Sequence, residues 1–156
     1  MVELLISAAI LSVGVLGLAM LQVMVIRTNA GSRSSTTAIK VGQWVADQIQ
    51  NEGRARLLYA RNGQTPGAST FFGSNTAIPM YFDFDGKKQS VSKPNANTFF
   101  TVTITPSDLC TAVTSVGAVK QFRIDVVFVD SVDPANASKT INRTFTFTRQ
   151  VAYANA

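Results

Sequence analysis

The chain has 156 residues, a formal net charge of +5, one cysteine and no histidine. One cysteine excludes an intramolecular disulfide, and the lack of histidine removes the commonest general base and metal ligand. No nucleophile-elbow or P-loop pattern occurs either, so we expect a protein that is not an enzyme and that has no cofactor and no metal site.

The first feature along the chain is Glu3, which stands alone before an uncharged and mostly apolar run from Leu4 to Ile26. As a helix this run would be about 35 Å long, enough to cross the ~30 Å hydrocarbon layer of a bilayer. It is longer than the apolar region of a signal peptide, so we interpret residues 1–26 as a retained membrane span. A carboxylate at the edge of a span indicates a functional residue, and snorkelling to the headgroups is the alternative.

The charges that flank the run conflict with its expected orientation. Arg27, Arg33 and Lys40 follow it, and only Glu3 and the amino terminus precede it. The positive-inside rule would therefore place the carboxyl side in the cytoplasm. The alternative is that a basic leader has been removed from the amino side.

Residues 27–60 have the pattern of an amphipathic helix that rests one face on a domain. Ala38, Val41, Val45 and Ile49 recur at spacings of three and four, with Trp44 beside them. We expect Val41, Trp44 and Val45 to pack against the rest of the protein, with a role for Trp44 as a membrane-interface anchor as the alternative. Together with the apolar run, this pattern predicts one long helix from about Val2 to about Leu58.

Two glycines interrupt the apolar run. Gly14 and Gly17 each lower helix stability by about 1 kcal/mol relative to alanine. They would allow local unwinding, or a close approach of a neighbouring helix at this three-residue spacing. Ordinary membrane-helix glycines are an equally good interpretation.

Residues 61–156 have the pattern of a β-rich head. The breaker cluster Asn62 to Gly67 ends the helical region, and beyond it the apolar period changes from 3.6 to 2. Asp85-Gly86 is a turn signal, and a calcium loop at Asp83 to Gly86 is the alternative. The segment from Asp130 to Ser138 is predicted to be a loop. The alternating segments are Ile78 to Asp85, Phe99 to Thr105, Val119 to Val129 and Ile141 to Arg149. The sequence thus predicts an α+β fold, in which a long N-terminal helix packs on an antiparallel sheet of about four strands.

The amino-terminal motif carries a family resemblance. Met1 to Ile6 resembles the start of type IV pilins and pseudopilins, and Ile10 to Gln22 is similar to PilV-type minor pilins in particular. The resemblance covers about the first quarter of the chain, and the layout of the remainder is compatible with it.

This resemblance implies a pilin fold and a defined route of assembly. A basic leader is cut by a prepilin peptidase, which methylates the new amino terminus in the inner membrane. The subunit then joins other pilin subunits in an extracellular filament used for adhesion, twitching motility or DNA uptake. Glu3 matches the family glutamate, which pairs with the amino terminus of a neighbouring subunit.

The chain departs from the family pattern in two ways. The glutamate is the third residue here instead of the fifth mature residue, and the usual glycine and phenylalanine around the cut are absent. We therefore expect two mature residues and a leader to precede Met1. The carboxyl-terminal cysteine pair of many pilins is also absent.

Two other functions fit the sequence. A pseudopilin of a type II secretion machine would share the same motif. A single-pass membrane-anchored module that binds DNA or a surface ligand would need a positive stripe on the head. The basic residues are scattered, so DNA is a weak candidate partner.

Overall fold

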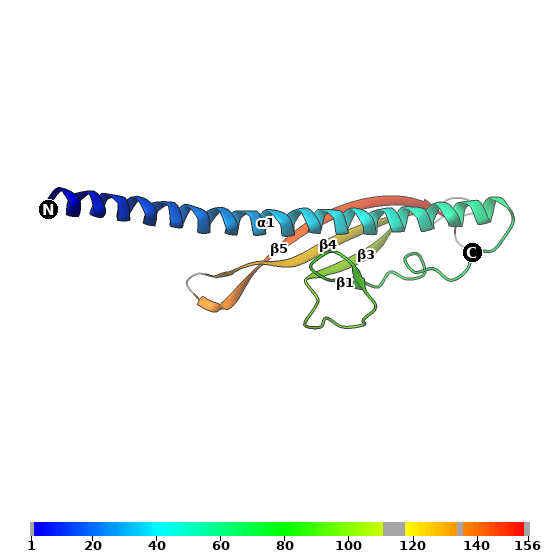
Figure 1. The fold of residues 1–156 in the computed structure, drawn as a ribbon. Coiled ribbons are helices and arrows are strands. Elements are labelled where there is room, and N and C mark those ends of the chain that lie inside the picture. Colours follow the sequence, from blue (N-terminus) through cyan, green and yellow to red (C-terminus); the bar gives the residue numbers. More distant parts are fainter. Residues whose placement is uncertain (1, 111–117, 134–135, 155–156) are drawn as a thin grey trace. The chain divides into compact units, whose positions relative to one another are not determined.

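A computed structural model describes residues 2–110, 118–133 and 136–154 of the chain. It contains one long helix and a five-stranded antiparallel sheet, so the predicted α+β fold is confirmed (Figure 1). The chain divides into two compact units, Met1–Ser35 and Thr36–Ala156. The elements are α1 Val2–Arg61, β1 Ile78–Phe82, β2 Lys88–Gln89, β3 Phe100–Cys110, β4 Ala118–Asp133 and β5 Asn136–Tyr153.

The helix α1 ends in a hydrogen-bonded cap one turn beyond the predicted Leu58. Gly63 has a φ of 68°, in the left-handed region that glycine adopts without a steric cost. The Gly63 amide donates to the Ala60 carbonyl at 3.1 Å, and the Gln64 amide donates to the Tyr59 carbonyl at 2.9 Å. These two bonds form a Schellman motif, which satisfies the last helical carbonyls.

The sheet has the strand order β2-β1-β3-β4-β5. Four strands were expected, and the fifth is the two-residue β2, which returns along β1 after the turn at Gly86. The predicted loop from Asp130 to Ser138 is wrong, because β4 continues to Asp133 and β5 begins at Asn136. Its polar residues are typical of turns. Nevertheless, cross-strand pairing with Ser131 opposite Ile141 continues after a bulge that follows Val129.

The core of the second unit lies between the later part of α1 and one face of the sheet. The alternation of β3 and β4 is as predicted: their apolar side chains point inward and are buried, while threonines alternate with them on β3. The helix contributes its predicted stripe at spacings of three and four. The buried residues are Ala38, Val41, Val45 and Ile49 from α1, Phe100, Val102 and Ile104 from β3, and Phe122, Ile124, Val126 and Phe128 from β4.

Two glycines that the sequence did not single out allow α1 to approach β5 closely. A Cβ atom added at Gly42 would overlap the ring of Phe147, and one added at Gly53 would overlap Val151 Cγ1. A side chain at either position would require the helix, the Phe147 ring or the Val151 side chain to move. The tight contact between α1 and β5 therefore depends on glycine.

Polar side chains tie the segment between α1 and β1 to the rest of the unit. Lys120 is 3% exposed, and its Nζ atom donates to the Phe72 carbonyl at 3.3 Å and to the Ser74 carbonyl at 3.5 Å. Its charge is balanced by Asp108, at 3.5 Å. The Asn75 amide donates to the other Asp108 oxygen at 2.6 Å. The buried ammonium thus has a counter-ion, as burial of a charge requires.

We expect Gly53→Ala to destabilise the second unit. Alanine raises helix propensity by about 1 kcal/mol, but overpacking against Val151 costs about 1–3 kcal/mol, so the free energy of unfolding falls. Denaturant titration of the full chain in micelles, followed by circular dichroism, measures the change. Gly67→Ala is the matched control, because an added Cβ there meets nothing within 4 Å. Equal stability of the two variants would contradict the close approach.

A second prediction concerns pH. Hydrogen bonding from the Asn75 amide, followed by the Lys120 charge, holds the pKa of Asp108 below its usual value. A carboxyl whose folded-state pKa is depressed stabilises the fold above its unfolded pKa, and this stability is lost as pH falls through the folded pKa. Asn75→Ala should raise the pKa of Asp108, as measured by NMR titration of the side-chain carboxyl carbon. Asn142→Ala, at an exposed position of β5, should leave it unchanged.

Candidate functional site

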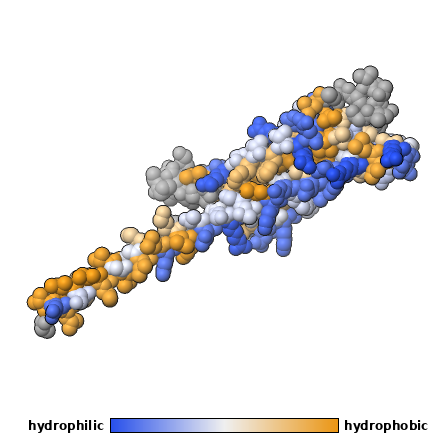
Figure 2. All heavy atoms as spheres, turned by 90° about the horizontal axis from the view of Figure 1, so that it is seen from above, coloured by the Kyte–Doolittle hydropathy of each residue, from blue (hydrophilic) through white to orange (hydrophobic). Residues whose placement is uncertain are grey.

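From Val2 to Ile26, the helix of the first unit presents an apolar surface on all sides. The large apolar side chains between Val2 and Ile26 are 50–78% exposed, and Figure 2 shows this stretch as almost continuously hydrophobic. By length and composition α1 is apolar enough to cross a membrane. A helix that is hydrophobic all round needs a lipid or protein environment that covers it. The side chain of Arg27 lies outside the described residues.

Glu3 lies in the first turn of α1 and is exposed. Its backbone carbonyl accepts a hydrogen bond from Ser7 Oγ at 2.8 Å, but no described residue bonds to its carboxylate. A negative charge in the first turn interacts favourably with the helix dipole, by about 0.3–1 kcal/mol at an exposed site. Among the described residues, the carboxylate therefore has the helix dipole as its favourable interaction and no cationic partner.

Gly14 and Gly17 lie in an unbroken stretch of α1. A Cβ atom added at either position would meet nothing within 4 Å. Packing against the residues that the structure describes therefore gives no reason for glycine at these positions, in contrast to Gly42 and Gly53. Their proposed roles in unwinding or in contact with another helix stay predictions.

The three predicted packing residues of α1 have different environments. Val41 and Val45 are buried in the core, whereas Trp44 is 43% exposed. The Trp44 ring meets Phe82 edge-on, with 5.8 Å between ring centroids and an angle of 79° between planes. Trp44 therefore packs against Phe82 without being fully buried. It lies at the rim, with one side packed and the other in solvent.

The turn between β1 and β2 is built by Asp83 and Gly86. Gly86 has a φ of 80°, and its amide donates to the Asp83 carbonyl at 3.0 Å. The Asp83 carboxylate accepts from the Lys87 amide at 2.8 Å, so it stabilises the turn. Among the described residues, no group of three His, Cys, Asp or Glu side chains is placed to share a metal ion.

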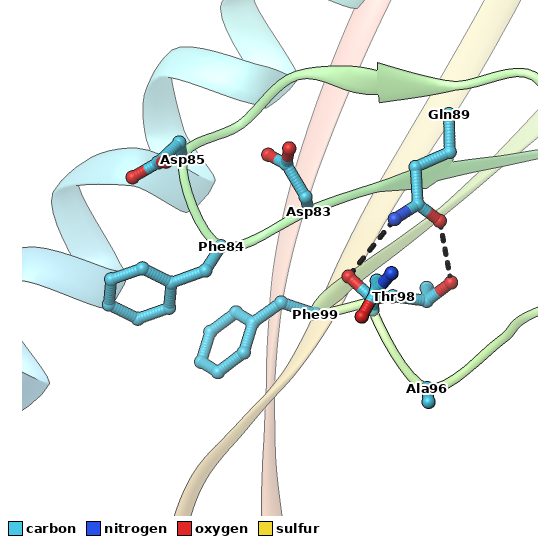
Figure 3. A pocket seen from close by; sticks show the side chains of 8 residues that line it. Asp83, Phe84, Asp85, Gln89, Ala96, Thr98 and Phe99 are labelled. Carbon is cyan, nitrogen blue, oxygen red and sulfur yellow. Dashed lines mark hydrogen bonds between the residues drawn. The ribbon is translucent and has the colours of Figure 1, made fainter.

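A hollow of about 460 Å³ beside this turn is lined by side chains that bond to one another (Figure 3). Gln89 Nε2 donates to the Asn97 carbonyl at 3.0 Å, and Thr98 Oγ1 donates to Gln89 Oε1 at 2.8 Å. Phe84 and Phe99 meet edge-to-face with 4.9 Å between centroids. These groups hold the segment before β3 against β2. Their hydrogen-bonding atoms are therefore used to stabilise the fold.

Several basic side chains of the second unit are already engaged within it. Lys120 is paired with Asp108, and Arg123 lies 3.0 Å from Asp125. Arg56 is buried and donates to the Gly67 carbonyl at 3.1 Å, and Arg149 donates to Gln50. These contacts reduce the number of cations available for the phosphate binding that a DNA-binding module would need.

A second hollow, of about 310 Å³, lies between α1 and the β1–β2 edge of the sheet. Trp44 lines it together with polar residues that the sequence did not single out. No local motif could have indicated them, because the hollow joins segments far apart in the chain. The polar residues are Gln48, Asn51 and Glu52 from α1, Thr70 from the following segment, and Lys88 from β2.

Comparison of the chain with models of protein families, with curated proteins and with solved structures gave no match.

Proposed function

We propose that the chain is a structural subunit, a minor pilin, of a type IV pilus-like filament. The observation that carries this proposal is the helix surface from Val2 to Ile26, which is apolar on all sides and has Glu3 as its only charge. The same helix continues into a folded α+β head. A filament subunit requires this combination of an apolar helix for assembly and a folded domain for display.

The helix must be covered in two successive environments. Before assembly, lipid covers the apolar side chains of the inner-membrane subunit. In the filament, neighbouring pilin subunits take the place of lipid. Fully burying one Leu, Ile or Val side chain is worth about 1.5–3 kcal/mol, so contact with water would be far costlier than either state. Because of this cost, the subunit would leave the membrane favourably only by entering the filament directly.

Glu3 supplies the specific interaction in this scheme. An isolated carboxylate in a low-dielectric environment is costly, and an ammonium partner offsets that cost. No described residue of the chain provides one. The partner we propose is the amino terminus of a neighbouring subunit, exposed after a prepilin peptidase has removed a leader. The similarity of Met1 to Ile6 to type IV pilins supports this assignment.

The membrane part of the proposal predicts the effect of arginines within the run. Leu11→Arg combined with Val15→Arg should release the chain from membranes, because each arginine near the centre of a span costs about 2.5–3.5 kcal/mol. Carbonate extraction of cell membranes, followed by immunoblotting, measures the retained fraction. The matched control is Ala55→Arg with Leu58→Arg, at exposed positions of α1 in the second unit. Full retention of both double variants would count against a span.

The assembly part predicts that Glu3→Gln and Glu3→Ala are inserted in the membrane but do not enter filaments. The isosteric glutamine keeps the shape and removes the charge that would pair with the ammonium. Immunoblots of sheared filaments and of washed membranes separate the two steps. Asp47→Asn, another exposed acid on α1, is the matched control and should assemble normally.

Normal incorporation of the Glu3 variants would refute the charge-pairing role. Deletion of the gene identifies the machine: loss of twitching or adhesion supports a pilus. Loss of protein secretion, with twitching intact, would assign the chain to a type II secretion pseudopilus instead.

A further inference from the structure

The hollow between α1 and the β1–β2 edge combines an aromatic platform with convergent polar groups. Trp44, Gln48, Asn51 and Glu52 follow one another at helical spacings of four, three and one, so they line one side of it from the same face of α1. Met80 of β1 and Lys88 of β2 line it from the sheet. All of these residues belong to the second unit.

The apolar part of the hollow is supported by the core. The Trp44 ring packs edge-on against Phe82 and remains 43% exposed. Met80 and Phe71, which also line the hollow, are buried members of the core. An indole held in this way offers a flat apolar surface whose conformational entropy has already been lost in folding.

The polar groups around this platform are largely unused. The side chains of Gln48, Asn51 and Lys88 make no hydrogen bond or ion pair with any residue that the structure describes. Glu52 uses Oε1 to accept from Ser69 Oγ and from the Thr70 amide, and Oε2 takes part in neither bond. The hollow in Figure 3 is different, because Gln89 and Thr98 bond to each other there. The hollow beside Trp44 therefore has free donors and free acceptors.

These properties define the chemistry of a ligand. One carboxylate and one ammonium nearly cancel, which disfavours a phosphate or another strongly charged group. The amides and the carboxylate line an open apolar surface, which disfavours an alkyl chain. A sugar ring has an apolar C–H face for the indole and adjacent hydroxyls that both donate and accept. A volume of about 310 Å³ is at the lower end for small-molecule sites and suits one or two such rings.

We propose that this hollow binds a neutral pyranose unit of a glycan. Trp44 stacks on the C–H face of the ring, and the amides of Gln48 and Asn51 bond to neighbouring hydroxyls. Glu52 Oε2 accepts from a hydroxyl and Lys88 donates to one. This inference does not rest on the filament proposal, since every residue it uses lies in the second unit of a single chain.

The only tryptophan of the chain lies in the hollow, so its fluorescence reports on this site alone. The full chain is held in micelles of a zwitterionic detergent without sugar headgroups. It is titrated with the methyl glycosides of glucose, galactose, mannose, N-acetylglucosamine and N-acetylgalactosamine. At least one should change the Trp44 emission saturably, with a dissociation constant of about 1 mM or weaker. Saturation-transfer NMR on the same sugars gives a second readout that does not depend on fluorescence.

Matched variants locate the binding. Gln48→Ala should weaken the interaction by roughly tenfold, because a hydrogen bond worth about 1–1.5 kcal/mol is lost. Gln43→Ala makes the same change at an exposed position on the same helix outside the hollow and should bind like the unmodified chain.

Two results would overturn the proposal. One is the absence of a saturable signal from all five glycosides in both readouts. The other is equal binding by Gln48→Ala and Gln43→Ala, which would place the sugar elsewhere on the chain. Because the assay uses unassembled protein in micelles, neither result depends on whether the chain enters filaments.

Discussion

The uncovered apolar surface of α1 between Val2 and Ile26 is the constraint on which the behaviour of the chain depends. Backbone hydrogen bonds are satisfied within a helix, so this segment tolerates lipid as well as protein neighbours. Water is the one environment that it does not tolerate. The segment is compatible with this constraint because Glu3 is its only charged residue. The part of the protein that is simplest in composition is therefore the part most dependent on other molecules.

The later part of the same helix is stabilised by different means. From Ala38 to Ile49 a narrow apolar stripe is buried against the sheet, and Gly42 and Gly53 bring the backbone close to β5. Glycine within a helix costs about 1 kcal/mol relative to alanine. That cost is offset because the close approach partly buries Phe147 and buries Val151 against α1. Tertiary packing, rather than helix propensity, thus maintains this half of the helix.

The sequence predicts those parts of the fold that depend on periodicity. The long helix, the buried stripe and the alternating faces of β3 and β4 follow from spacings of 3.6 and 2 and are found in the structure. The prediction of a loop from Asp130 to Ser138 is wrong for a physical reason. Turn-forming residues near Ser131 lie within strands because the pairing of β4 with β5 continues past Val129. The role of Gly42 depends on Phe147, more than a hundred residues away, which no local pattern indicates.

The same distinction applies to the candidate sites. A single acid before an apolar run is visible in the sequence, so Glu3 could be proposed as a functional residue from the sequence alone. The structure adds that no described residue neutralises the Glu3 carboxylate. Apolar helices slide past one another with little preference, because one Leu or Val contact is worth much the same as the next. A charge pair has a single position of lowest energy, so an ammonium opposite Glu3 would set the axial register that the apolar surface leaves open. A filament of this kind would take its strength from the many apolar residues and its register from the one charge among them.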